Sequence, residues 1–389
     1  MGEVKILIEK FFNEGNTHIK KENPVEESFL NKKIIFSEYP LLIYWELTRA
    51  CDLVCKHCRA NSIKNPEQNE LNTNQIFKII DDIRENFSKN TTIVFTGGDP
   101  LKRNDLFEII DYTRKKGVRF ALAPSATNLI TYKIIEKLKE SGVESISLSL
   151  DSHNPDIHDK IRGVEKTFQR TIELANIINS LNINLQINTL IYKENYNDLE
   201  RMYEFLEKNI KPHRWSLFLL IKTGRGTELE EPTASEVEKF NNRLYKIHKN
   251  SSFLIKTTEL HHYRRTFIKR MINEGKSIEE IKKTSIYRGA GIRDGNGIIF
   301  ISSKGFVYPS GFLPLIVGNL KKNILSDIYK NSSLLKKLRD PDNFEGKCGY
   351  CEFRYICGGS RARAFAKTKN PFSSEPLCLY KPQVFNKFY

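Results

Sequence analysis

Short apolar segments alternate with amphipathic helical patterns along this 389-residue chain, and this alternation limits the folds open to it. The apolar segments lie at residues 41–47, 92–95, 119–123, 145–150, 185–191 and 215–221. Helical patterns follow them at residues 78–87, 106–116, 132–141, 168–181, 199–209 and 234–249. Strands that alternate with helices favour a parallel sheet covered by helices. We therefore predict an α/β fold with a complete or partial barrel, and ligands at the carboxyl ends of its strands.

Three cysteines directly follow the first predicted strand: Cys51, Cys55 and Cys58. Three thiolates from one loop can bind three irons of a cubane [4Fe–4S] cluster and leave the fourth iron without a protein ligand. A small molecule can bind at such an open iron and receive an electron. Because the loop follows a strand, we expect the cluster at the mouth of the barrel.

The CxxxCxxC spacing of this loop resembles the signature of the radical S-adenosylmethionine (SAM) enzymes, whose open iron chelates SAM. The resemblance implies a partial (β/α)6 TIM-like barrel as the core. It also implies reductive cleavage of SAM to a 5′-deoxyadenosyl radical that abstracts a hydrogen atom from a substrate carbon. Cys51, Cys55 and Cys58 are then the catalytic cysteines.

Other motifs of that family follow the later strands. The string Thr96-Gly-Gly-Asp-Pro resembles the GGE-like motif that holds the methionine amino group of SAM, and an Asp there can accept an ammonium. The string His158-Asp-Lys-Ile-Arg-Gly resembles the HDxxRG segment, whose guanidinium can grip a carboxylate with two hydrogen bonds. The alternative is that these are ordinary turns and caps. The predicted SAM contacts are Gly97, Gly98, Asp99, Pro100, Ser149, Asp151, Arg162 and Asn188.

The other four cysteines lie near the end of the chain: Cys348, Cys351, Cys357 and Cys378. Four thiolates can form a structural zinc site. Their order and spacing resemble instead the C-terminal SPASM domain of radical SAM enzymes, which implies an auxiliary [4Fe–4S] cluster that serves as electron acceptor or relay. Ser310 and Ser360 occupy positions where relatives often have cysteines. A serine hydroxyl must ionise to compete with a thiolate, so we predict one auxiliary cluster and not two.

Several strings resemble the haem-maturing branch of the family, which includes the alternative-pathway haem b synthase: 95–100, 186–189, 222–226 and 357–364. The resemblance implies a tetrapyrrole substrate that is oxidatively decarboxylated. Arginines can pair with propionates and a histidine can contact the ring. The alternative is an ordinary basic helix face. The predicted substrate residues are His261, His262, Tyr263, Arg264 and Arg265.

Three other functions fit parts of the sequence. A maturase for a ribosomally made peptide has the same architecture, although the residues before the barrel are too few for the usual peptide-recognition domain. A non-catalytic iron–sulfur electron carrier needs only the clusters, and a zinc-containing scaffold needs only the tail. The motifs for a nucleoside pocket disfavour the last two.

The chain carries a formal net charge of +15. Such a surplus favours acidic partners, and we expect an acidic electron donor such as ferredoxin or flavodoxin, although a solvated lysine surface is the alternative. No nucleic-acid-binding motif is present. No signal-peptide core is seen, and no apolar run approaches the roughly 20 residues of a membrane span. Seven cysteines cannot all pair in disulfides, and clustered thiols point to metal binding in a reducing compartment, so we expect a cytoplasmic protein.

The texture of the sequence suggests four segments. We predict an N-terminal extension at 1–38, the radical SAM core at 39–249, a basic connecting segment at 250–295, and a SPASM-like domain at 296–389. The last begins with a predicted hairpin whose turn is Lys304-Gly305.

Overall fold

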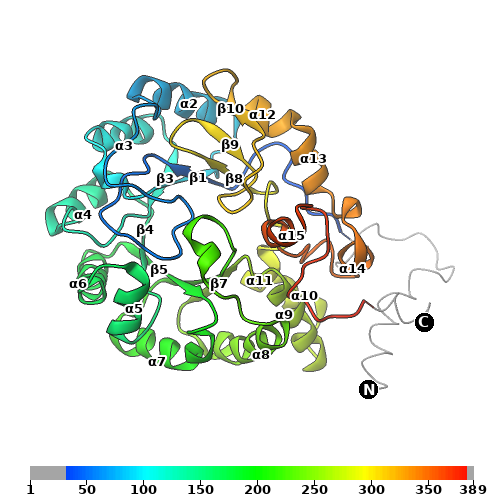
Figure 1. The fold of residues 1–389 in the computed structure, drawn as a ribbon. Helices are drawn as coiled ribbons and strands as arrows, with labels where there is room; N and C mark the ends of the chain where they lie inside the picture. The colour runs from blue at the N-terminus through cyan, green and yellow to red at the C-terminus, as the bar shows by residue number, and fades with distance from the viewer. Residues whose placement is uncertain (1–31, 383–389) are drawn as a thin grey trace.

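The computed structural model describes residues 32–382, and its central element is one ten-stranded sheet. The strands follow the order β10-β9-β8-β1-β2-β3-β4-β5-β6-β7, and all neighbours from β8 to β7 pair in parallel. Their bounds are β1 Leu42–Glu46, β2 Thr92–Thr96, β3 Arg119–Leu122, β4 Ser145–Ser149, β5 Asn184–Ile191, β6 Arg214–Leu219, β7 Leu254–Thr258, β8 Ile298–Ile301, β9 Phe306–Tyr308 and β10 Gly318–Asn319. The sheet curls around a central space (Figure 1), which confirms the predicted partial barrel.

Helices surround the sheet on its outside (Figure 1). Those of the first part of the chain are α2 Thr73–Asn86, α3 Leu106–Lys115, α4 Tyr132–Glu140, α5 Pro155–Arg162, α6 Thr167–Ser180, α7 Leu199–Asn209 and α8 Ala234–Asn250. The later ones are α9 His262–Asn273, α10 Ile278–Lys282, α11 Ser285–Arg288, α12 Leu325–Asn331, α13 Ser333–Arg339, α14 Gly346–Tyr350 and α15 Arg361–Thr368. Short 3-10 turns lie at η1 Pro100–Lys102, η2 Tyr196–Asp198, η3 Gly224–Glu228 and η4 Pro341–Asn343.

Apolar periodicity explains why these segments form a barrel. In α2, Ile76, Ile80 and Ile83 recur at helical spacing and are buried, and a capping box between Asn72 and Gln75 starts the helix. Strand β1 is a nearly continuous apolar run, as expected for a parallel strand that is covered on both faces. All six predicted strands and all six predicted helices are present.

The sheet continues across the predicted boundary near residue 295. Strands β8 and β9 form the expected antiparallel hairpin, with Gly305 at its turn in the left-handed region at φ +84°. Strand β8 also pairs in parallel with β1, so the last part of the chain extends the barrel itself. Strand β7 lies in the predicted connecting segment. The predicted domain limits at residues 38, 249 and 295 rest on changes in sequence composition and stay a prediction.

Residues 1–31 of the predicted N-terminal extension lie outside the described residues. Within residues 32–382, no helix combines the length and the apolar character that are needed to cross a lipid bilayer.

Candidate active site

Cys51, Cys55 and Cys58 line one cavity of about 260 Å³ at the carboxyl ends of the strands. Hydrogen-bond donors reach two of the sulfurs from the backbone, since Leu53 N lies 3.4 Å from Cys51 Sγ and Ser62 N lies 3.4 Å from Cys58 Sγ. Burial raises the pKa of the Cys55 thiol, so a bound metal must favour its thiolate. Three such sulfurs around one cavity fit a [4Fe–4S] cluster with an open iron.

Arg225, from η3 after β6, braces the cysteine loop. Its guanidinium donates to Cys55 O at 2.8 Å, to Ser62 O at 3.1 Å and to Ser62 Oγ at 3.1 Å. Its backbone N–H donates to Cys58 O at 3.0 Å. The sequence reading used this string only as a family likeness and missed the role. Nothing local could reveal it, because Arg225 and Cys55 lie 170 residues apart.

The predicted glycine pair follows β2 and lies against the start of the cysteine loop. Gly98 N donates to Thr48 O at 2.8 Å, and a Cβ on Gly98 would lie only 2.3 Å from Ala50 O. A side chain would therefore push the two loops apart. Gly97 and Gly98 line the same cavity as the three cysteines.

Asp99 and Pro100 do not line this cavity, and their contact with SAM stays a prediction. The Asp99 carboxylate is fully buried and accepts hydrogen bonds from Thr127 Oγ1 at 2.9 Å and Leu101 N at 3.2 Å. Its side chain therefore caps η1 and fixes the loop. Burial raises the pKa of this carboxyl group. An acidic residue at the end of a strand can either cap a turn or bind a ligand, and the sequence alone does not distinguish these two roles.

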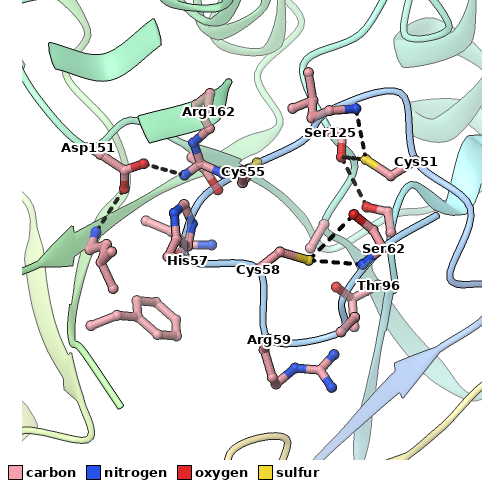
Figure 2. A pocket seen from close by; sticks show the side chains of 18 of the residues that line it. Cys51, Cys55, His57, Cys58, Arg59, Ser62, Thr96, Ser125, Asp151 and Arg162 are labelled. Carbon is pink, nitrogen blue, oxygen red and sulfur yellow. Dashed lines mark hydrogen bonds and ion pairs between the residues drawn. The ribbon is translucent and has the colours of Figure 1, made fainter. Parts of the chain in front are cut away.

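Asp151 and Arg162 form a buried ion pair at the cavity wall, with 2.8 Å between Arg162 Nη2 and Asp151 Oδ2. Arg162 Nη1 also lies 3.8 Å from Cys55 Sγ, so the guanidinium stands between the carboxylate and the sulfur (Figure 2). Burial opposes ionisation of Asp151, but the charge of Arg162, two neighbouring histidines and the hydrogen bond from Leu190 N together outweigh it and lower the pKa of the carboxyl group. Arg162 is thus already paired, and the predicted grip on a SAM carboxylate has to share this guanidinium with Asp151.

Ser149 and Asn188 line the same cavity from neighbouring strands, where they are partners in the β4–β5 register. His57, inside the cysteine loop, also lines it and was not singled out from the sequence. Burial lowers the pKa of His57 to about 4, so this imidazole is neutral at physiological pH. Phe218 and Phe312 add an apolar wall. The cavity thus combines sulfur ligands, polar strand ends and an apolar face.

A second hollow of about 370 Å³ adjoins the first and shares Arg59, Ala60 and Thr223 with it. The Arg59 guanidinium lies 4.3 Å from the centre of the Phe300 ring and 3.0 Å from Glu46 Oε2. The other aromatic and cationic residues that line this second hollow are Phe306, Tyr308, Arg49 and Lys304.

Cys348, Cys351, Cys357 and Cys378 surround a separate small cavity. Glu375 N lies 3.2 Å and Arg361 Nη2 lies 3.7 Å from Cys348 Sγ, and Gly359 N lies 3.4 Å from Cys357 Sγ. Such donors stabilise the anionic sulfurs of a cluster. Across residues 32–382, no three metal-binding side chains converge on a point that could hold a single metal ion.

The two serines that replace expected cysteines bond to buried carboxylates. Ser310 Oγ donates to Asp294, and Ser360 Oγ donates to Glu259. Asp294 also accepts from the backbone N–H of Arg361, the residue after Ser360, at 3.1 Å. Burial raises the pKa of Glu259 and of Asp294. The hydroxyls are thus engaged in protein contacts.

The predicted substrate residues do not line the first cavity, and their contact with a substrate stays a prediction. All five residues are buried: His261, His262, Tyr263, Arg264 and Arg265.

The side chains of these predicted substrate residues contact other parts of the protein or line the four-cysteine cavity. Arg264 donates to Ile292 O at 2.8 Å, and the Tyr263 hydroxyl lies 3.1 Å from His248 Nδ1. His262 and Arg265 line the four-cysteine cavity.

Comparison with known proteins agrees with this geometry. Residues 45–206 match the family model of the radical SAM superfamily. The chain is 36% identical over 351 residues to an AdoMet-dependent heme synthase of Methanosarcina barkeri, which covers 90% of this chain and 99% of that protein. It is 26% identical to the mycofactocin maturase MftC of Mycobacterium tuberculosis, over 87% of this chain and 83% of that protein.

Among solved structures, Streptococcus suis SuiB bound to S-adenosylmethionine aligns with a TM-score of 0.68 and 19% identity, over 97% of this chain and 88% of that one. That likeness shows the fold. The sequence match to the heme synthase extends over 90% of the chain. The chain belongs to the radical SAM superfamily.

Proposed function

We propose that this radical SAM enzyme converts iron-coproporphyrin III to haem b by oxidative decarboxylation of two propionate side chains. The observation that carries the proposal is the 36% identity to an AdoMet-dependent heme synthase over 90% of the chain. The likeness is not limited to the cysteine loop, because it extends over 351 residues.

The reaction has a simple balance. Each propionate loses one hydrogen atom and CO2 and becomes a vinyl group, and the remaining electron goes to a one-electron acceptor. The clusters and SAM, when bound, supply the radical that takes the hydrogen atom and the acceptor for the electron. Cys51, Cys55 and Cys58 would hold the SAM-binding cluster, and the four tail cysteines would hold the acceptor.

The residues of the protein itself bind, orient and exclude water. Gly97, Gly98, Ser149 and Asn188 offer polar contacts to SAM at one side of the cavity. Phe218 and Phe312 add apolar lining to the same cavity, which protects a reactive carbon from solvent.

The adjoining hollow supports a large, flat, anionic substrate. Phe300, Phe306 and Tyr308 offer aromatic faces, and Arg59 and Lys304 offer positive charge for carboxylates. Lys304 and Arg49 share the carboxylate of Glu67, and Arg59 pairs with Glu46. Three cations and one carboxylate, Glu46, line the hollow itself, which favours an incoming propionate.

The test is turnover by the reconstituted enzyme without oxygen. The protein is incubated with iron-coproporphyrin III, SAM and a reductant, and tetrapyrroles and 5′-deoxyadenosine are quantified. We expect haem b, with one 5′-deoxyadenosine for each propionate removed, and no product from the Cys55→Ala variant. SAM cleavage that leaves the porphyrin unchanged would refute the proposal and direct the search to peptide substrates.

The electron source is part of the proposal. The net charge of +15 favours a small acidic donor such as ferredoxin or flavodoxin. Turnover supported by such a donor should fall as salt rises, because screening weakens attraction between exposed charges.

A further inference from the structure

Two polar side chains of α9 face the four-cysteine cavity without a complete set of partners. His262 is 1% exposed, and neither of its ring nitrogens has a hydrogen-bond partner among the described residues. Arg265 is 5% exposed and binds Glu238 through its Nη atoms, at 3.2 and 2.6 Å, while its Nε has no partner in that same part of the chain. Both line the cavity together with all four cysteines.

An orphaned donor in a buried site costs free energy unless a ligand satisfies it. The lining of the cavity includes one carboxylate, Glu375, whose oxygens already accept hydrogen bonds from Ser360 N at 2.8 Å and Leu377 N at 3.1 Å. The rest of the lining consists of the four cysteines, two glycines, three apolar or aromatic side chains and two further cations. An imidazole carries at least one ring N–H in either protonation state, so His262 can donate to an acceptor in the cavity.

We propose that His262 and Arg265 donate hydrogen bonds from the barrel side to the sulfur atoms of an auxiliary cluster and thereby raise its reduction potential. The inference rests on the proposed auxiliary cluster. Hydrogen bonds to cluster sulfurs stabilise the reduced, more negative state, so they favour acceptance of an electron. The tail supplies the ligands, and the barrel helix α9 tunes the acceptor.

His262 is a positioning and tuning residue in this account. It would act on the cluster, and the substrate cavity does not include it. Its placement on α9 also links the acceptor to the barrel, since the helix begins four residues after the end of β7.

The experiment is a potentiometric titration followed by EPR on the full-length chain. Cys51, Cys55 and Cys58 are replaced by alanine, so that only the auxiliary cluster contributes a signal. His262→Leu removes the N–H, His262→Gln keeps a donor, and His213→Leu is a matched control at an exposed histidine. Iron is measured in every sample.

We expect His262→Leu to lower the ratio of reduced to oxidised cluster at fixed potential about tenfold, which is 59 mV for one electron. The shift is towards negative potential, with about four irons per chain retained. His262→Gln should stay closer to the parent, and His213→Leu should match it.

Equal midpoints for the parent and His262→Leu would overturn the inference. Equal loss of iron in His262→Leu and His262→Gln would do the same, since side-chain volume would then matter and not the N–H. A parent chain without any iron would overturn the auxiliary cluster itself. These results are distinguishable, because only the absence of iron would also contradict the proposed function.

Discussion

Arg225→Gln tests how the protein keeps its catalytic cysteines in place. The substitution removes a guanidinium that makes three hydrogen bonds to the cysteine loop, two to backbone oxygens and one to the Ser62 hydroxyl. The loop is otherwise short of regular structure between β1 and α2. We therefore expect the ordered form of the loop to depend on this side chain.

The magnitude follows from the hydrogen bonds. Each contributes about 1 kcal/mol net in a partly buried setting, so the three together stabilise the ordered loop by about 3 kcal/mol. Since each 1.4 kcal/mol is about a tenfold change, the ordered form should lose about 100-fold in population relative to alternatives. The backbone bond from Arg225 N to Cys58 O survives the substitution.

The assay is retention of iron against a chelator, together with the EPR change that SAM induces. We expect Arg225→Gln to keep about four irons, those of the tail cluster, and to lose the SAM response. Arg201→Gln is the control, because Arg201 is exposed on α7 and, within residues 32–382, forms an ion pair with Asp198 alone. If Arg225→Gln keeps about eight irons as firmly as the parent, the bracing role is refuted.

Three further predictions concern the remaining contacts. Cys351→Ala should leave slow SAM cleavage but stop haem formation, because the electron acceptor is lost; normal product yield would refute this. Asp151→Asn should destabilise the fold by about 3 kcal/mol in urea unfolding, because it leaves Arg162 buried and unpaired, while Glu194→Gln at an exposed ion pair should have little effect. The pKa of Asp151 is lower in the folded state than its ordinary value of about 4. The stabilisation is therefore present above about pH 4 and is lost as the pH falls through the folded pKa. A stability difference between parent and Asp151→Asn that stays constant through that range would contradict the ion pair. Reconstituted parent protein should contain about eight irons per chain, and about twelve would show a second auxiliary cluster despite the serine contacts.

Sequence periodicity was sufficient for the barrel because its strands and helices are regular and local. It placed the cysteine loop, the glycine pair and the polar ends of β4 and β5 around one cavity. It could not separate a capping role from a ligand role for Asp99, since both need an acidic residue at a strand end. Sequence periodicity also could not predict the orientation of α9, because packing against the C-terminal part of the chain decides which way His262 points. Arg225 shows the same limit, since its partners are distant along the chain.

The most direct measurement of the central claim is the fate of one substrate hydrogen. Iron-coproporphyrin III that carries deuterium on the propionate carbons next to the ring is supplied with SAM and reductant, and 5′-deoxyadenosine is analysed by mass spectrometry. The account predicts deuterium in 5′-deoxyadenosine in step with the formation of vinyl groups. Unlabelled 5′-deoxyadenosine beside vinyl products would contradict it.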